Sequence, residues 1–197
     1  WSMVGESRIY KLYDIVSDLE KRKVPGAFVE CGVWKGGCAA VMAAASQKYQ
    51  PARQMWLFDS FEGLPKPKPE DGEKAMKEYE TNPSPATIEE VRALFASLQL
   101  SWEPMHAVKG WFQDTLPQNA SQIGPIALLR LDGDWYESTK QCLESLYDQV
   151  IPGGCVIIDD YGSWPGCKQA VDEFLASRSL KPALERIGTS GSVFFYV

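Results

Sequence analysis

The stretch Leu129-Arg-Leu-Asp-Gly-Asp-Trp-Tyr-Glu-Ser-Thr139 decides the fold of this chain, together with Cys155-Val-Ile-Ile-Asp-Asp-Tyr161. In each stretch an apolar run typical of a buried strand ends in two carboxylates, namely Asp132 and Asp134, then Asp159 and Asp160. Parallel strands end at the same edge of a sheet, so these four acids are expected to meet in one crevice. So much negative charge calls for a hard divalent cation. The sequence therefore predicts a metal-centred site.

The composition is that of an ordinary globular protein. The 197 residues suit one domain, and we expect a single domain over residues 1–197. The net charge of −6 argues against nucleic-acid binding, which needs clustered Lys and Arg. No apolar run approaches the ~20 residues of a membrane span, and no basic-then-apolar leader precedes the first expected helix. The five cysteines form no Cys-x-x-Cys pair, which favours reduced thiols and a cytoplasmic location.

Strands and helices alternate along the chain. An N-terminal helix is expected within residues 1–25, and strands are expected over residues 27–31, 54–58, 105–108, 126–131 and 155–158. Residues 184–187 and 192–197 predict a closing hairpin. This alternation indicates an α/β fold with a mostly parallel central sheet, helices on both faces and a C-terminal antiparallel hairpin.

Three further segments have clear local signals. Residues 63–86, rich in Pro, Lys and Glu, predict a surface insertion or lid with a short helix near residues 73–80. Thr87 followed by Glu90 has the spacing of a capping box for a helix that ends near residue 98. The run Pro152-Gly-Gly154 predicts a turn into the last parallel strand.

The first expected strand leads into the glycine turn Gly32-Val-Trp-Lys-Gly-Gly37 and then a helix. Gly32 and Gly36 let the backbone approach a ligand, and the helix start offers free N–H groups. The loop lacks both the G-x-G-x-x-G pattern and the Gly-Lys-Ser/Thr of a phosphate loop. Glu30 would repel a pyrophosphate but suits an ammonium group. This favours an amino-acid-bearing ligand such as S-adenosylmethionine over NAD or ATP.

Asp59 ends the second expected strand. Cofactor-binding α/β folds place an acid there on the ribose hydroxyls, and a turn cap is the alternative role. At the other end of the site, Asp132 and Asp134 lie two apart and point the same way if the strand stays extended. Two or three of the four acids suffice for Mg²⁺, and the remaining one could act as general base. Alternatively, Asp134 and Asp160 are caps or turn acids.

The histidine and the tryptophans complete the candidates. His106, the only histidine, lies in an expected strand away from the acids, so a structural role is predicted. Four tryptophans fall in loops beside the motifs, and some of them are expected to line the substrate cleft: Trp34, Trp111, Trp135 and Trp164.

Five ordered blocks resemble the macrocin O-methyltransferase family, which comprises metal-dependent sugar O-methyltransferases of macrolide and aminocoumarin biosynthesis. The blocks span residues 29–37, 57–65, 109–117, 128–139 and 153–162, so the match covers nearly the whole chain. The resemblance implies a Rossmann-like class I methyltransferase fold, S-adenosylmethionine, Mg²⁺ and a homo-oligomer. The spacing of Glu30, Gly32 and Gly36 is also similar to that of catechol O-methyltransferases.

The resemblance also implies roles for individual residues. Asp132, Asp159 and Asp160 are the expected metal ligands, and Asp134 is the expected catalytic base. Glu30 and Gly32 are expected to hold the methionine end of the cofactor, and Asp59 with Ser60 the ribose. The full set of expected cofactor-binding residues is Glu30, Gly32, Gly36, Asp59, Ser60, Gly110 and Trp111.

The expected reaction is therefore methyl transfer from S-adenosylmethionine to one hydroxyl of a vicinal diol on a glycosylated natural product. A catechol or phenol acceptor would use the same metal site. A metal-dependent phosphotransferase is a second alternative, which the missing phosphate loop disfavours. A non-catalytic S-adenosylmethionine-binding module is the third, and it is disfavoured because all four acids are present.

Overall fold

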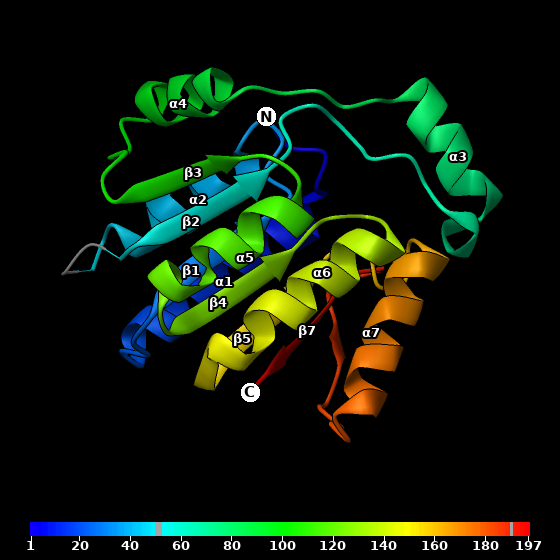
Figure 1. The fold of residues 1–197 in the computed structure, drawn as a ribbon. Coiled ribbons are helices and arrows are strands. Elements are labelled where there is room, and N and C mark those ends of the chain that lie inside the picture. Colours follow the sequence, from blue (N-terminus) through cyan, green and yellow to red (C-terminus); the bar gives the residue numbers. More distant parts are fainter. Residues whose placement is uncertain (50–52, 190) are drawn as a thin grey trace.

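A single twisted sheet runs through the computed structural model, which describes residues 1–49, 53–189 and 191–197 (Figure 1). Within these residues the strand order is β3-β2-β1-β4-β5-β7-β6. The strands are β1 (Ala27–Cys31), β2 (Met55–Asp59), β3 (Met105–Lys109), β4 (Ile126–Leu131), β5 (Val150–Ile158), β6 (Glu185–Arg186) and β7 (Val193–Tyr196). Strands β1 to β5 are parallel, while β7 runs antiparallel to both β5 and β6. The predicted α/β sheet with a C-terminal hairpin is confirmed.

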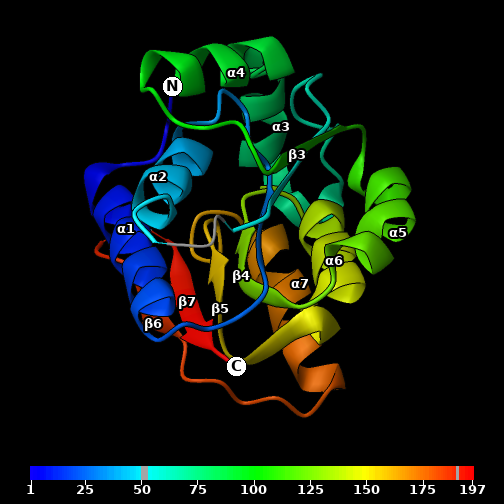
Figure 2. The same ribbon diagram turned by 90° about the vertical axis from the view of Figure 1, so that its left-hand side faces the viewer.

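Helices cover both faces of the sheet (Figure 2). One face carries α1 (Glu6–Lys21), α2 (Gly37–Ser46) and α4 (Ile88–Ser97), and the other carries α5 (Phe112–Ile123), α6 (Tyr136–Leu146) and α7 (Pro165–Ser177). Successive side chains of a strand point to opposite faces. Accordingly, Phe28 and Leu128 pack in the first apolar layer and Val29 and Leu129 in the second. Two covered faces explain why the central strands β1 and β4 are apolar except for Glu30 and Arg130, which pair across them.

Two local predictions differ from the structure. Helix α5 was not expected, because Pro117 lies inside it and a proline removes one helical hydrogen bond. The predicted turn over residues 152–154 is wrong, since these residues belong to β5. Its register against β4 shifts between the pairs Ile126–Val150 and Leu128–Cys155, so the extra residues form an irregularity within the strand.

The order of the strands creates the position for a site. Strand β1 lies between β2 and β4, and the helices that follow β1 and β4, α2 and α6, cover opposite faces. Such a switch in winding direction leaves a crevice beyond the carboxyl ends of the strands, where α/β folds bind ligands.

The 63–86 segment crosses this end of the sheet and reaches the start of α6 and α7 (Figure 1). It contains a short 3₁₀ helix (Pro69–Asp71) and α3 (Gly72–Thr81), which confirms the predicted short helix. Its two ends meet where the Leu64 N–H donates to the Pro83 carbonyl at 3.1 Å. The predicted capping box is also present, with Thr87 Oγ1 accepting from the Glu90 N–H at 3.1 Å.

Candidate active site

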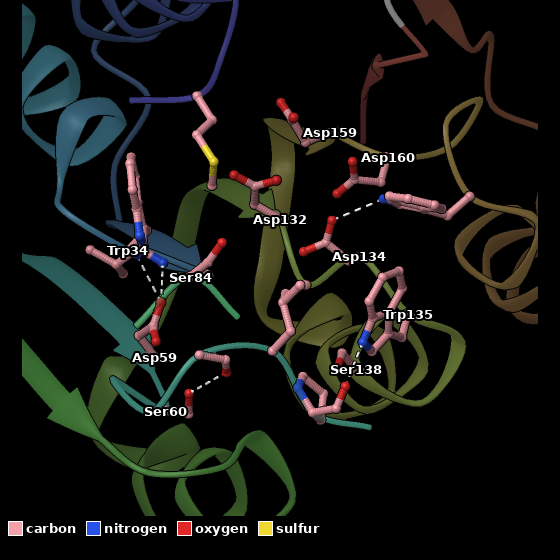
Figure 3. A pocket seen from close by; sticks show the side chains of 18 of the residues that line it. Trp34, Asp59, Ser60, Ser84, Asp132, Asp134, Trp135, Ser138, Asp159 and Asp160 are labelled. Carbon is pink, nitrogen blue, oxygen red and sulfur yellow. Dashed lines mark hydrogen bonds between the residues drawn. The ribbon is translucent and has the colours of Figure 1, made fainter. Parts of the chain in front are cut away.

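A cavity of about 840 Å³ opens at the carboxyl ends of β1, β2, β4 and β5. It is lined by the acids that end these strands: Glu30, Asp59, Asp132, Asp134, Asp159 and Asp160. The β4–β5 register pairs Leu131 with Ile158, so the acids that follow them emerge side by side. Figure 3 shows the four aspartates of the two motifs gathered on one side of the cavity, with Asp59 and Trp34 opposite. The prediction that the four acids meet is confirmed.

The glycine turn after β1 is shaped by its neighbours in the chain. Gly32 has a φ of +91°, and a Cβ there would overlap the Asp132 carbonyl oxygen and lie 2.7 Å from the carbonyl carbon. Gly36 has a φ of +83°, and its missing Cβ leaves room for Val91. Gly32 lines the cavity and Gly36 does not. Gly32 therefore lies directly against the backbone of Asp132, so the glycine turn after β1 and the loop after β4 are in contact.

We expect Gly32→Ala to lower the free energy of unfolding by about 3 kcal/mol, because it combines backbone strain with a backbone clash. Gly124→Ala is the control, since Gly124 also has a positive φ (+70°) but has nothing within 4 Å of the new Cβ. Urea unfolding of both variants measures the difference. Equal losses in the two variants would show that the contact with Asp132 costs nothing.

Asp59 holds the glycine turn in place. Its Oδ2 accepts from the Val33 and Trp34 N–H groups at 2.7 and 2.8 Å, and its Oδ1 accepts from the Phe61 N–H at 2.7 Å. The turn-cap role considered for Asp59 is thus present. The neighbouring Ser60 donates to the Gly63 carbonyl at 2.9 Å. Both residues line the cavity. The expected contact of Asp59 and Ser60 with a ribose stays a prediction.

Glu30 is buried at the floor of the cavity. Its Oε1 accepts from Arg130 Nη1 at 2.8 Å, while its Oε2 has no hydrogen-bond partner among the residues that the structure describes. Burial raises the pKa of Glu30 to about 8, and Asp132 adds to the rise while Arg130 opposes it. A buried carboxylate oxygen without a donor costs free energy, and an ammonium group of a ligand would supply that donor. This fits the amino-acid end of S-adenosylmethionine.

Three carboxylates form a group suited to a metal ion. Asp132, Asp159 and Asp160 each offer an oxygen, and these oxygens lie within 4.8 Å of one another. Asp160 Oδ2 is buried and has no hydrogen-bond partner in the described part of the chain. Burial raises the pKa of Asp159 to about 6, and it raises the pKa of Asp160 still further, with Asp134 the next cause. Hard oxygen donors in this number fit Mg²⁺, whose charge would offset the crowding of the acids.

Asp134 stands beside this group but apart from it. Strand β4 ends at Leu131, and Asp134 has a φ of +59°, so the condition that Asp132 and Asp134 share an extended strand is not met. The Asp134 Oδ1 accepts from Trp164 Nε1 at 2.9 Å. Burial raises the pKa of Asp134 to about 8, and the charge of Asp132 is the second cause. The Asp134 carboxylate therefore faces Asp132, Asp159 and Asp160 from the loop that follows β4 (Figure 3).

The other expected contacts divide into two groups. Trp34, Trp111, Trp135 and Trp164 all line the cavity, and their contact with substrate or cofactor stays a prediction. Gly110, like Gly36, is outside the cavity lining; its φ of +140° and the nearby Thr115 side chain explain the glycine. His106 stacks on the Trp56 ring at 4.3 Å, in keeping with a structural role.

The residue that sequence reasoning missed is Arg130. Its guanidinium is 2% exposed and joins Glu30, Asp132 and Asp159 at 2.8, 2.8 and 2.9 Å. Asp159 is also paired with Arg8 from α1. The signal was present in the sequence, because a charged residue in a strand with two covered faces needs a buried partner. Glu30 is that partner, and the two residues are paired across β1 and β4.

Within the described residues, no helix combines the length and the apolarity that crossing a membrane requires.

Comparison with known proteins identifies relatives over almost the whole chain. Residues 1–196 match the family model "Macrocin-O-methyltransferase (TylF)". Demethyldecarbamoylnovobiocin O-methyltransferase of Streptomyces niveus is 38% identical over 194 residues, covering 96% of this chain and 73% of that protein. Mycinamicin III 3''-O-methyltransferase of Micromonospora griseorubida is 32% identical over 196 residues, covering 96% of this chain and 76% of that protein.

A solved structure agrees with these relatives. The O-methyltransferase NovP superposes with a TM-score of 0.90 at 36% identity, covering 99% of this chain and 81% of that chain. The fold is therefore the Rossmann-like fold of class I methyltransferases, as predicted. Family and fold favour methyl transfer over the phosphotransferase alternative. The chain belongs to the macrocin O-methyltransferase family and is an S-adenosylmethionine-dependent methyltransferase.

Proposed function

We propose that this protein is a Mg²⁺-dependent O-methyltransferase that methylates one of two neighbouring hydroxyls on a glycosylated natural product. The observation that carries the proposal is the shared cavity. It is lined by the three acids suited to Mg²⁺, by Asp134 beside them and by Glu30 with a free oxygen. A metal site, a candidate base and a donor site within one cavity are the parts that such a reaction needs.

The chain's own residues have distinct tasks in the proposed mechanism. When bound, S-adenosylmethionine supplies an electrophilic methyl group, and Mg²⁺ lowers the pKa of the attacking hydroxyl. Asp132, Asp159 and Asp160 hold the cation, and Glu30 accepts hydrogen bonds from the ammonium group of the donor. Asp134 removes the proton from the hydroxyl that is methylated. Trp164 keeps the Asp134 carboxylate in place through the 2.9 Å hydrogen bond.

The acceptor class is inferred from the relatives and from the far half of the cavity. A relative from Streptomyces olivaceus, 37% identical, is named as the 4'-O-methyltransferase of a 2,3-dimethoxy-rhamnosyl-tetracenomycin. In this chain the cavity beyond the acids is lined by indole rings and by hydrogen-bonding side chains: Trp135, Ser138, Gln141 and Trp164. Flat apolar rings beside polar groups suit a glycoside, which also has both kinds of surface.

A panel of acceptors tests this proposal. The purified protein is incubated with S-adenosylmethionine, Mg²⁺ and either deoxysugar glycosides of macrolide, aminocoumarin and polyketide aglycones or simple catechols. Mass spectrometry is expected to find a gain of one methyl group on a sugar hydroxyl. Glycosides whose neighbouring hydroxyl is already methylated are expected to react poorly, in contrast to the 2,3-dimethoxy sugar in the name of the Streptomyces olivaceus relative. Turnover of catechols alone would contradict the sugar acceptor and favour the catechol alternative.

Removing divalent cations is expected to abolish methyl transfer, and Mg²⁺ is expected to restore it. Binding to the folded state alone stabilises it by about 2.7 kcal/mol when Mg²⁺ is at 100 times its dissociation constant. Thermal melting in EDTA and in Mg²⁺ measures this effect without substrate. Asp160→Asn should lose most of the shift, while Asp114→Asn, an exposed acid on α5, should keep it. Full activity in EDTA would contradict a metal requirement.

The homo-oligomer implied by the family resemblance also stays a prediction. Sedimentation velocity at several concentrations tests it, and a single monomeric species throughout would contradict it.

A further inference from the structure

The 63–86 segment inserts a buried carboxylate between two helices of the active site. Asp71 is 1% exposed although its neighbours Glu70 and Gly72 are exposed. Its Oδ1 accepts from the N–H of Tyr136, the first residue of α6, at 2.7 Å. Its Oδ2 accepts from the Lys68 N–H at 2.8 Å. A buried acid with such partners has a specific task, because burying a carboxylate is costly.

The start of α7 is shaped to admit this carboxylate. A Cβ on Gly166 would overlap Asp71 Oδ1 and lie 3.1 Å from the Asp71 Cγ. Gly166 is the second residue of α7 and is buried. The absence of a side chain at this position therefore leaves the space that Asp71 fills, so both helix starts contact one carboxylate.

Further contacts join the segment to the residues around Asp134. Trp135 Nε1 donates to the Pro65 carbonyl at 2.8 Å, and the Trp135 and Trp164 rings pack edge to face with centroids 5.0 Å apart. Lys74 Nζ lies 4.5 Å from the centroid of the Trp164 ring. Trp164 is the same indole that donates to Asp134. The segment is thus packed on the two tryptophans that flank and hold the candidate base.

We propose that Asp71 is a positioning residue. It fastens the 63–86 segment to the start of α6 and thereby fixes Asp134 relative to the part of this segment that lines the cavity. The inference rests on the proposed role of Asp134 as base. Asp134 lies only two residues before Tyr136, in the left-handed backbone region (φ +59°) that non-glycine residues adopt uncommonly and aspartate more readily than most. The Asp71–Tyr136 hydrogen bond holds the end of that short loop.

The same segment forms one wall of the cavity. The middle of the segment contributes the polar lining residues Lys66, Lys68, Asp71, Lys74 and Glu78, whereas Ser84 near its end lies beside Trp34 (Figure 3). An acceptor that enters beyond the acids would contact this wall. Release of the segment would therefore weaken acceptor binding and misplace Asp134 together, while the Glu30 side of the cavity, built on β1, would be untouched.

The test compares four variants of the full chain. Asp71→Ala removes both hydrogen bonds, and Asp71→Asn keeps one acceptor for the Tyr136 N–H. Gly166→Ala expels the carboxylate from the other side. Glu70→Ala is the matched control, because Glu70 is an exposed acid in the same turn and is outside the cavity lining.

Three measurements follow for each variant: kcat and KM for the acceptor, calorimetric affinity for S-adenosylhomocysteine, and the rate of trypsin cleavage after Lys74 and Lys77. For Asp71→Ala we expect about tenfold lower kcat, a raised KM and about tenfold faster cleavage, with cofactor affinity unchanged within twofold. Asp71→Asn should be intermediate, and Glu70→Ala should resemble the unmodified protein. Gly166→Ala should behave like Asp71→Ala, and the double variant should be no worse than either.

Unchanged kcat and KM in Asp71→Ala would overturn the proposal. So would an equal loss of cofactor affinity and of turnover, because that pattern indicates general unfolding. An independent effect of Gly166→Ala in the Asp71→Ala background would show that the two residues do not act through one contact. Failure of the proposed base is seen separately, as full activity of Asp134→Asn with cleavage at the normal rate.

Discussion

Asp134→Asn is expected to lower kcat for acceptor methylation by about 1,000-fold, within the range that loss of a general base causes. The amide has the shape of the carboxylate and can still accept from Trp164 Nε1, so the loop should keep its conformation. Only the capacity to take a proton is removed. Affinity for S-adenosylhomocysteine should stay within twofold, because Asp59 and Trp34 of the glycine turn lie on the opposite side of the cavity from Asp134 (Figure 3).

The stability of this variant gives a second readout. Burial, with the charges of Asp132 and Asp159, raises the pKa of Asp134 to about 8, so the amide removes a charge only above that pH, where its loss relieves repulsion. The melting temperature without Mg²⁺ should therefore equal or exceed that of the unmodified protein. A variant that is folded, binds cofactor and fails to turn over identifies a chemical role. Asp114→Asn is again the control, and kcat close to normal in Asp134→Asn would exclude it as the base.

Trp164→Phe separates the presence of the base from its orientation. Phenylalanine keeps a ring at the position but lacks the N–H that donates to Asp134. A smaller fall in kcat, about tenfold, is expected from the loss of orientation alone.

The parts of the fold that were predictable depend on local periodicity and on strand ends. The five parallel strands were recognisable because apolar runs of that length, separated by helical patterns, fit only a covered sheet. Thr87 and Glu90 marked the start of α4 through a capping box, which acts over four residues. Helix α5 was hidden because Pro117 and a polar run weaken its local signal. Packing of Leu116 and Ile123 against the sheet stabilises it in spite of the proline.

The candidate site shows the same division. The four aspartates were predictable because the register of neighbouring parallel strands brings residues after β4 and β5 together. Asp71 could not be found in this way, since its partner Tyr136 is 65 residues away and its burial depends on the space at Gly166. A polar segment that lies loosely on the surface and one that is fastened by a single buried acid can have the same amino-acid composition. Only the three-dimensional contacts distinguish them.

Arg130→Met is expected to lower the free energy of unfolding by roughly 3–5 kcal/mol without Mg²⁺, the usual cost of removing one partner of a buried ion pair. The guanidinium lies between Glu30, Asp132 and Asp159 and is the cation that serves all three. Methionine fills much of the same volume, so the loss is mainly one of charge and hydrogen bonds. Lysine is a poor replacement, because a single ammonium group lacks the planar fork that reaches three carboxylates.

The decisive measurement is how Mg²⁺ changes the loss of stability caused by Arg130→Met. In the unmodified protein Arg130 and a bound cation would both neutralise Asp132 and Asp159, so each leaves less repulsion between these acids for the other to offset. Without Arg130 the acids repel one another more strongly, and a divalent cation relieves more of that repulsion. The rise in melting temperature between EDTA and Mg²⁺ should therefore be larger in Arg130→Met than in the unmodified protein.

Arg53→Met provides the matched control. Arg53 is also a largely buried arginine, paired with Glu20 at 2.8 Å, but neither residue lines the cavity. Its replacement should destabilise the fold by a similar mechanism while leaving the Mg²⁺-dependent shift unchanged. An equal shift in all three proteins would mean that Arg130 only supports packing. A larger shift in Arg130→Met alone would mean that this arginine offsets the negative charge of Asp132 and Asp159 in the cation-free protein. That compensation would allow four acids to lie in one cavity of the folded chain.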